Sequence, residues 1–303
     1  MRNFNIKKIL IPLDFSDTSL LALEHGAYMA SLFKADIILL HVVKPNWSVF
    51  TTEYPSVPMY TLQEIEESGM KKLGEVAVRI RQEHKIRVET ICEIGHVCPV
   101  IVSVADEHNV DLIIVGTHGV SGFEERFIGS NAYRVVNQAQ HPVITVQTHS
   151  KRRGFKDILL PIDNSSYSSQ KVNHAVEIAK HYESKIHILG LLNSDDEAER
   201  DKLKIKLSGI EEFMHRRGLI RNPRRHIKMG MNYAKLTMAH AEEIGADLII
   251  IMTEWEAVIT GLFIGPFARQ IVNHSKIPVM SIRPEVAPEL IENQKPFWMI
   301  EFG

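Results

Sequence analysis

The sequence predicts an α/β protein made of two tandem doubly wound domains, each with a parallel five-stranded sheet. Short apolar segments alternate with longer amphipathic ones along the chain, which is typical of strands joined by helical crossovers. The chain also repeats itself: residues 7–14 match 156–163, residues 110–114 match 246–250, and residues 141–146 match 277–282. Two copies of one domain are therefore joined in one chain.

Each copy is expected to alternate five strands with four helices. The first helix of each copy follows Ser-rich cap residues and has apolar residues at helical spacing, over 19–32 and 168–182. The strands of the first copy are expected at 9–13, 36–43, 87–93, 112–115 and 143–146.

The domain boundaries follow from the repeat. We place the first domain at residues 1–148, the second at 152–284 and a C-terminal tail at 285–303. The offset between the copies falls from 149 residues at Lys7 and Lys156 to 136 at Asp111 and Asp247, so the first copy has 13 additional residues. The Pro- and aromatic-containing stretch 44–61 is expected to hold them as a loop or lid.

Composition narrows the class of protein. The chain has 303 residues, 45% hydrophobic and 24% charged, enough for two domains with a core each. Its net charge of −2 gives no general attraction for nucleic acid or an acidic membrane. There is no signal segment and no apolar run near twenty residues, and Cys92 and Cys98 are expected as reduced thiols. We therefore expect a cytoplasmic protein with no membrane span and no nucleic-acid partner.

A glycine motif predicts a phosphate site. The strand 112–115 runs into Gly116-Thr117-His118-Gly119, and Gly129-Ser130-Asn131 opens a helical stretch. Glycine allows the backbone to approach an anion closely, and a helix N-terminus presents N–H groups and a positive dipole end to it. Ligands bind outside the carboxyl ends of the strands in such sheets.

Asp14 follows the first strand and would lie at the same edge of the sheet. A carboxylate facing a ribose and glycines facing phosphates together indicate a nucleotide site. The alternative for Asp14 is a structural cap of the turn that precedes the first helix.

The second copy lacks this motif. A Trp fills a phosphate cradle, a Pro at the helix start removes an N–H donor, and Glu254 and Glu256 add negative charge. We expect that the second copy keeps the fold, with Asp163 as a structural cap, and does not bind ATP. The apolar stretch 258–267 either packs on the sheet or lines another pocket. The residues that replace the motif are Met252, Trp255, Gly265, Pro266 and Phe267.

No catalytic or metal-binding set accompanies the glycine motif. The sequence has no nucleophile–base pair, no paired carboxylates and no P-loop Lys-Ser/Thr ending, so we assign no catalytic residues and no metal ligands. The 15 histidines are spread along the chain and are interpreted as surface or satisfied residues. A basic cluster is interpreted as a solvated loop before a strand, with a phosphate-bearing partner as the alternative. Its members are Arg216, Arg217, Arg221, Arg224, Arg225 and Lys228.

The chain resembles a tandem universal stress protein. The likeness rests on Ile11-Pro12-Leu13-Asp14, on Leu40-His41-Val42-Val43 and on Gly116-x-x-Gly119-x9-Gly129-Ser130, and it spans both copies. It implies strand order 3-2-1-4-5, pseudo-twofold packing of the domains through their last strands as an intramolecular pseudo-dimer, and ATP with Mg²⁺ in the first domain. Pairing of whole chains into a homo-oligomer is left open.

The resemblance also assigns the nucleotide contacts. Asp14 would face the ribose or adenine, the Val42 backbone would meet adenine, and the glycine motif would hold the phosphates. The full set is Pro12, Asp14, Val42, Gly116, His118, Gly119, Gly129, Ser130 and Asn131.

Three functions remain open. The first is an ATP-binding stress or regulatory module read by an unidentified protein partner. The second is a slow ATPase or a phosphoryl- or nucleotidyl-transfer enzyme, because related folds host both chemistries. The third is a ligand-free structural protein. ATP turnover separates the first two, and nucleotide affinity separates the third.

Overall fold

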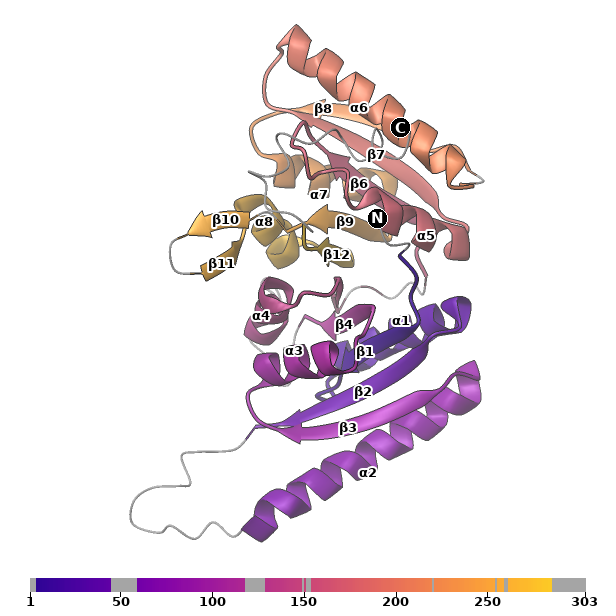
Figure 1. Ribbon diagram of the computed structural model, residues 1–303, viewed down its shortest axis with the longest axis vertical. Helices are drawn as coiled ribbons and strands as arrows, with labels where there is room; N and C mark the ends of the chain where they lie inside the picture. Colours follow the sequence, from indigo (N-terminus) through magenta and orange to yellow (C-terminus); the bar gives the residue numbers. More distant parts are fainter. Residues whose placement is uncertain are drawn as a thin grey trace.

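The computed structural model describes residues 4–44, 59–117, 129–148, 150, 154–219, 221–253, 255–258 and 261–284, with the backbone alone for 59–63, 255–258 and 261–263. The described chain forms two similar halves, one above the other, each with a twisted sheet between layers of helices (Figure 1). This is the α/β architecture that the alternation of segments predicts.

The first half contains the five expected strands, each within two residues of its expected bounds. Helix α2 begins at Met59, so the last three residues of the expected loop 44–61 are helical, and residues 45–58 lie outside the described part. Since no Gly or Pro lies between 59 and 68, nothing in the sequence delays the helix. The elements are β1 (Lys8–Pro12), α1 (Asp17–Phe33), β2 (Asp36–Val43), α2 (Met59–His84), β3 (Val88–Ile94), α3 (Val97–Glu107), β4 (Leu112–Gly116), α4 (Ser130–Gln138) and β5 (Val143–Val146).

The second half repeats this order and adds a hairpin before its last helix. The elements are β6 (Asp157–Ile162), α5 (Val172–Tyr182), β7 (Lys185–Leu192), α6 (Glu197–Arg216), β8 (Arg224–Met229), α7 (Tyr233–Ile244), β9 (Leu248–Met252), β10 (Trp255–Val258), β11 (Gly261–Ile264), α8 (Pro266–His274) and β12 (Val279–Ile282). Helix α5 was expected from residue 168 and begins only at Val172, after a run of turns.

The two halves share one sheet. The strand order is β3-β2-β1-β4-β5-β12-β9-β6-β7-β8, so each half has the predicted order 3-2-1-4-5. The last strands β5 and β12 pair antiparallel, with Val279 opposite Thr145 and Ser281 opposite Val143. This confirms the predicted pairing through the last strands, which covers two edges that would otherwise be exposed.

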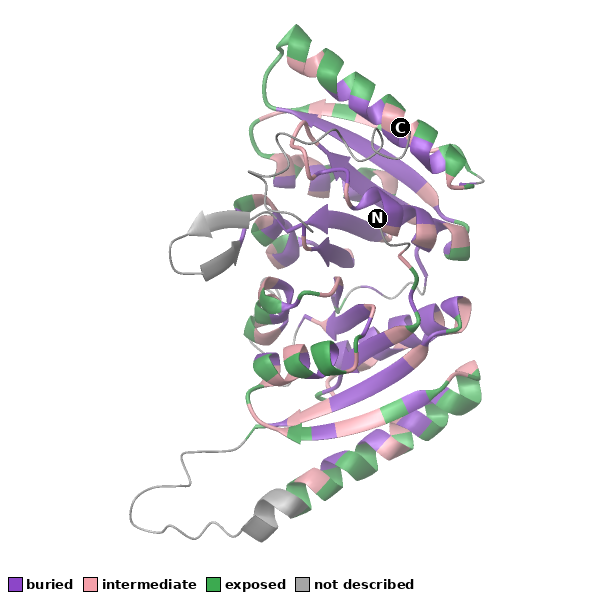
Figure 2. Ribbon diagram, in the orientation of Figure 1, coloured by how far each residue is buried: buried purple, intermediate pink, exposed green. Residues whose placement is uncertain are grey.

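The core lies on both faces of this ten-stranded sheet. Buried side chains of α1, α2, α5 and α6 form one cluster, and those of α3, α4, α7 and α8 form the other. Figure 2 shows buried strands at the centre and exposed positions on the outer helix faces. No helix in the described ranges is long and apolar enough to cross a membrane.

One carboxylate in each half fixes the start of the first strand. Asp111 Oδ2 accepts hydrogen bonds from the Lys7 and Lys8 amides at 2.7 and 2.9 Å. Asp247 Oδ2 does the same for the Lys156 and Asp157 amides at 2.9 and 3.1 Å. These contacts align the first and fourth strands of each half at the edge opposite the predicted site.

Candidate functional site

The predicted site of the first half lies where β1, β2 and β4 end. Strand β1 pairs parallel with β2 on one side and with β4 on the other. Parallel neighbours end at the same edge of the sheet, so Pro12, Asp14, Val42 and Gly116 are brought to one edge. Pro12 is buried, Val42 is partly exposed and Asp14 is exposed.

The N-terminus of α4 is held against the end of β4. The Gly129 amide donates a hydrogen bond to the Thr117 carbonyl oxygen at 2.5 Å, which joins the two ends of the glycine motif. Gly129 is the N-cap residue of α4 and makes no side-chain cap hydrogen bond, and Ser130 is exposed. In the described chain, the first turn of α4 thus presents amides without a side-chain cap beside Gly116. His118 and Gly119 lie outside the described residues.

Gly116 allows a close approach that no other residue permits. A Cβ atom at this position would lie 2.8 Å from the Thr18 carbonyl carbon and oxygen and 2.9 Å from the Ser19 nitrogen. All three atoms belong to the backbone at the start of α1, which cannot rotate away like a side chain. The glycine is therefore needed for packing of β4 against α1, whatever binds there.

Asp14 has a structural contact as well as an exposed position. Its Oδ1 accepts hydrogen bonds from the Ser16 amide at 3.0 Å and the Ser16 hydroxyl at 2.5 Å, and Ser16 is the N-cap of α1. Asp14 therefore caps the turn that precedes α1, as the structural alternative expected. Asp163 caps Ser165 in the same way, with 3.1 Å to the amide, as expected for the second half.

Three residues beside Asp14 were not singled out from the sequence. Phe15 has a left-handed backbone with φ 62°, which is unusual for an aromatic residue and stores strain next to Asp14. His41 Nδ1 lies 2.7 Å from the Leu13 carbonyl oxygen, so this nitrogen is the donor, and its ring lies 4.9 Å from that of Phe15. Lys72 of α2 lies 5.7 Å from the Phe15 ring centre. His41 lies in the strand end 40–43, but nothing in its local spacing predicts the contact with Leu13.

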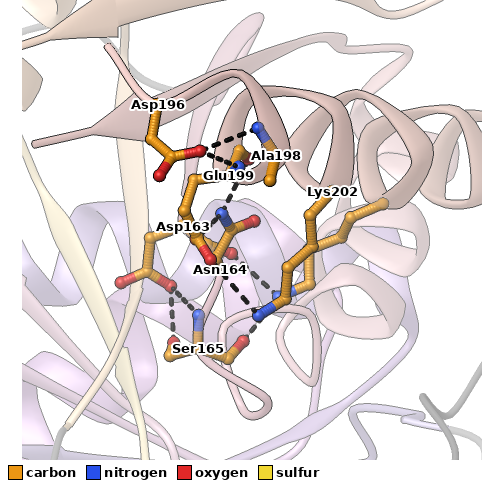
Figure 3. Close-up of polar contacts among 8 residues, drawn as sticks. Asp163, Asn164, Ser165, Asp196, Ala198, Glu199 and Lys202 are labelled. Atoms are coloured by element: carbon orange, nitrogen blue, oxygen red, sulfur yellow. Dashed lines mark hydrogen bonds and ion pairs between the residues drawn. The ribbon is translucent and has the colours of Figure 1, made fainter. Parts of the chain in front are cut away.

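The corresponding turn of the second half is tied down by α6. Figure 3 shows Asp163 directed at Ser165, and Asn164 directed at Glu199 in the first turn of α6. Asn164 Nδ2 donates to the Glu199 carbonyl oxygen at 2.9 Å, and Asp196 caps the helix by accepting from the Ala198 amide at 2.8 Å.

Lys206 of α6 completes this arrangement. Its Nζ donates to the carbonyl oxygens of Asp163 and Ser165 at 2.8 and 2.5 Å and contacts the Ser168 hydroxyl at 3.2 Å. Burial lowers the pKa of Lys206 to about 8, although the Asp163 carboxylate acts in the opposite direction. The buried ammonium thus holds the turn that follows β6.

The described residues of the second site line a small pocket. Its volume is about 20 Å³, which is enough for a water molecule and far too small for a nucleotide. Met252, at the position of Gly116, is 2% exposed. It lines the same small pocket as Ser168 and Lys171, which precede α5. The lining includes Asp163, Tyr167, Lys171, Tyr233, Met252 and Phe267.

In the described part of the stretch 258–267, one residue packs in the core and another lines the small pocket. The Ile264 side chain is buried, and its amide donates to Asn137 Oδ1 of α4 at 2.9 Å. The end of the hairpin therefore packs on the first half. Phe267 lines the small pocket.

The basic cluster is not a single loop. Arg216 and Arg217 belong to the end of α6, and Arg224, Arg225 and Lys228 to strand β8, so the loop expectation is wrong for them. Alternate side chains of the edge strand β8 are exposed. The sequence of this segment therefore resembles that of a solvated loop. Arg217 pairs with Glu177 at 3.0 Å and Lys228 with Glu243 at 3.1 Å. These ion pairs favour a structural interpretation over a phosphate-binding one.

Known proteins resemble this chain over both halves. A family model described as "Universal stress protein family" matches residues 5–147 and 154–283. Universal stress protein MJ0531 of Methanocaldococcus jannaschii is 32% identical over 145 residues, which are 48% of this chain and 84% of that protein. A universal stress protein of Mycolicibacterium smegmatis is 24% identical over 300 residues, 91% of this chain and 97% of its own length.

The fold comparison agrees with the sequence comparison. The crystal structure of a universal stress protein from Archaeoglobus fulgidus has a TM-score of 0.71 and 20% identity, covering 93% of this chain and 99% of that one. That similarity extends over both halves and shows the shared fold. Because the family model matches each half separately, the chain belongs to the universal stress protein family and carries two tandem domains of it.

Proposed function

We propose that the first domain binds ATP and that the protein acts as a nucleotide-binding stress or regulatory module, with the second domain structural or partner-binding. The observation that carries this proposal is the α4 N-terminus, which has no side-chain cap and is held by Gly129 and Thr117 next to Gly116. Helix N-termini of this kind bind phosphate through their amides and dipole. The exposed carboxylate of Asp14 follows β1, the neighbouring strand.

The remaining assignments extend this proposal. Asp14 and the Val42 backbone would hold the nucleoside, while Gly116, His118, Gly119, Gly129, Ser130 and Asn131 would hold the phosphates and their Mg²⁺ ion. Pro12 would line the nucleoside end. Mg²⁺ would arrive with the phosphates, because this ion binds phosphate oxygens and keeps several of its waters. The described residues of the second domain leave only a small pocket at the equivalent site, which supports one nucleotide per chain.

The two domains supply a matched test at Ser130. In the second domain, Pro266 stands at the first position of α8, after a Gly265 N-cap with no side-chain cap hydrogen bond, and the helix forms normally. Ser130→Pro should therefore keep α4 folded and remove one N–H donor, whereas Ser130→Ala removes only the hydroxyl. Loss of a hydrogen bond to a charged group costs about 1.5–3 kcal/mol. We expect ATP affinity to fall roughly tenfold to a hundredfold in Ser130→Pro and much less in Ser130→Ala.

The measurement is titration calorimetry of the full chain with ATP and with AMP, each in the presence of Mg²⁺. ATP should bind more tightly than AMP, and Gly119→Trp, which imports Trp255, should abolish binding. Asp163→Asn is the control and should leave affinity unchanged. Equal affinity of the wild type and Ser130→Pro for ATP would overturn the phosphate assignment.

Turnover tests the enzyme alternative. Phosphoryl transfer needs a positioned nucleophile and charge stabilisation in addition to a phosphate cradle, and the sequence supplies the cradle alone. We expect phosphate release below roughly 1 s⁻¹, the low end of ordinary enzyme turnover. Faster release that is lost in Gly129→Trp would establish the enzyme function instead.

A further inference from the structure

Three histidines lie together at the outer end of the second domain. His187 is on β7, His226 on the edge strand β8 and His240 on α7. The ring centres of His187 and His226 are 6.1 Å apart, and those of His226 and His240 are 4.5 Å apart. His187 and His240 are buried, and His226 is partly exposed. The expectation that the histidines are scattered is wrong for these three, which we name the histidine cluster.

Carboxylates fix the protonation of two rings. His187 Nε2 lies 2.9 Å from Asp157 Oδ1, and His240 Nδ1 lies 3.1 Å from Glu243 Oε2. An ionised carboxylate only accepts hydrogen bonds, so each of these nitrogens carries a proton. In the neutral form of either ring, the second nitrogen, Nδ1 of His187 or Nε2 of His240, carries a lone pair.

Three ring nitrogens of the histidine cluster are buried without a hydrogen-bond partner in the described part of the chain. His187 Nδ1, His240 Nε2 and His226 Nε2 have no hydrogen-bond partner among the described residues. Buried polar atoms in folded proteins almost always have one. Three such nitrogens lie together in this cluster, where a ring can take up a proton.

The first domain shows that the fold does not need this cluster. The strand registers and helix starts place Ile38, Ile91 and Val104 at the three corresponding positions. Ile38 and Val104 are buried core residues, and Ile91 packs against the same core. Aliphatic side chains thus fill this space in one domain, and ionisable ones fill it in the other.

Burial of His187 and His226 disfavours added protons. Burial lowers the pKa of His187, with Lys185 and Arg224 acting in the same direction and Asp157 in the opposite one. Burial lowers the pKa of His226 too, as do His240, His187 and Lys228, while Glu243 opposes them.

The sign of the effect follows from these shifts. A histidine with a lowered pKa binds protons better when its surroundings open. Protonation below the ordinary histidine pKa therefore favours an open state of this region, and neutral pH favours the closed one.

We propose that the histidine cluster is a proton-operated switch that releases β8 and α7 from β7 as the pH falls below neutrality. Strand β8 is the outermost strand of its sheet and has a strand partner on one side only. It can therefore open without separating the two domains. Within the described part of the chain, no group of three or more His, Cys, Asp and Glu side chains is placed to hold a metal ion.

Hydrogen–deuterium exchange of the full chain at pH 7.5 and pH 5.5, corrected for the intrinsic pH dependence of exchange, tests the proposal. Peptides covering 224–229 and 233–244 should exchange roughly three- to tenfold faster at pH 5.5, since each unit of pKa difference is worth a factor of ten in the opening equilibrium. Peptides covering 88–94 and 97–107, the counterparts in the first domain, should not change. An equal change in both domains, or no change in either, would overturn the proposal.

The first domain supplies the variant. His187→Ile, His226→Ile and His240→Val together import its residues and should abolish the pH difference. Replacement of His215, an exposed residue of α6, by Gln should preserve it. If the triple variant does not fold, His226→Ile alone should reduce the difference, because it removes the central ring.

His174 controls for a general acid effect. It lies on α5 with its ring centre 4.1 Å from that of Phe4, and burial lowers its pKa to about 4. It is intact in the triple variant. Acid sensitivity of β8 that persists in that variant would therefore assign the effect to His174 or another group and reject the histidine cluster.

Discussion

Gly116→Ala and Gly74→Ala should change stability in opposite directions. At Gly116, the added methyl group would lie 2.8–2.9 Å from three backbone atoms of α1, and overpacking of this kind costs about 1–3 kcal/mol. The unfolded chain loses entropy on the same substitution, which returns about 0.4–1 kcal/mol. Since Gly116 does not have a positive φ, there is no further backbone cost. The net destabilisation should be about 1–2 kcal/mol.

Gly74 is the matched control because a Cβ there meets nothing within 4 Å. It lies inside α2, where alanine is favoured over glycine by about 0.5–1 kcal/mol, so this variant should be more stable than the wild type. The measurement is urea unfolding without nucleotide, followed by circular dichroism at fixed protein concentration. If Gly116→Ala were as stable as the wild type or more stable, the backbone of α1 would move to accommodate the methyl group at little cost. The close-packing argument would then be wrong.

Two further predictions concern charged side chains that hydrogen-bond to the backbone. Asp111→Ala should destabilise the fold by about 2–3 kcal/mol in urea unfolding, because two strand amides lose a charged acceptor. Asp111→Asn should destabilise it less, because the amide side chain retains an acceptor oxygen. Equal destabilisation by the two variants would contradict this account. Lys206 has its pKa lowered from 10.5 to about 8, so the unfolded chain binds more protons between these values and stability should rise with pH across that window, by at most about 3 kcal/mol. Lys206→Met should lack this rise, and its persistence in the variant would assign it to another group.

Periodicity and repetition were enough to predict most of the fold. Strands such as 112–115 are apolar runs whose counterparts recur in the second copy, and each copy supports the assignment of the other. The seam between β5 and β12 was expected from the family resemblance, and it covers two strand edges that would otherwise be exposed.

Features that depend on distant contacts were not predictable. Met252 and Lys171 line the same small pocket although they are about eighty residues apart in the chain. Lys206 is an unremarkable position in a helix until the turn after β6 is placed against it. His187, His226 and His240 have no informative spacing, because the sheet register and the packing of α7 bring them together.

The antiparallel seam between β5 and β12 has a consequence for how the two sites can differ. In a symmetric dimer of separate chains, any substitution appears in both subunits, and dilution weakens the pairing. Joining both domains in one chain holds the partner strand at a high local concentration whatever the protein concentration. Each domain can then vary its own residues independently. Met252 lines the small pocket of the second domain, while the equivalent Gly116 packs against α1 in a domain that still depends on its neighbour for a covered edge.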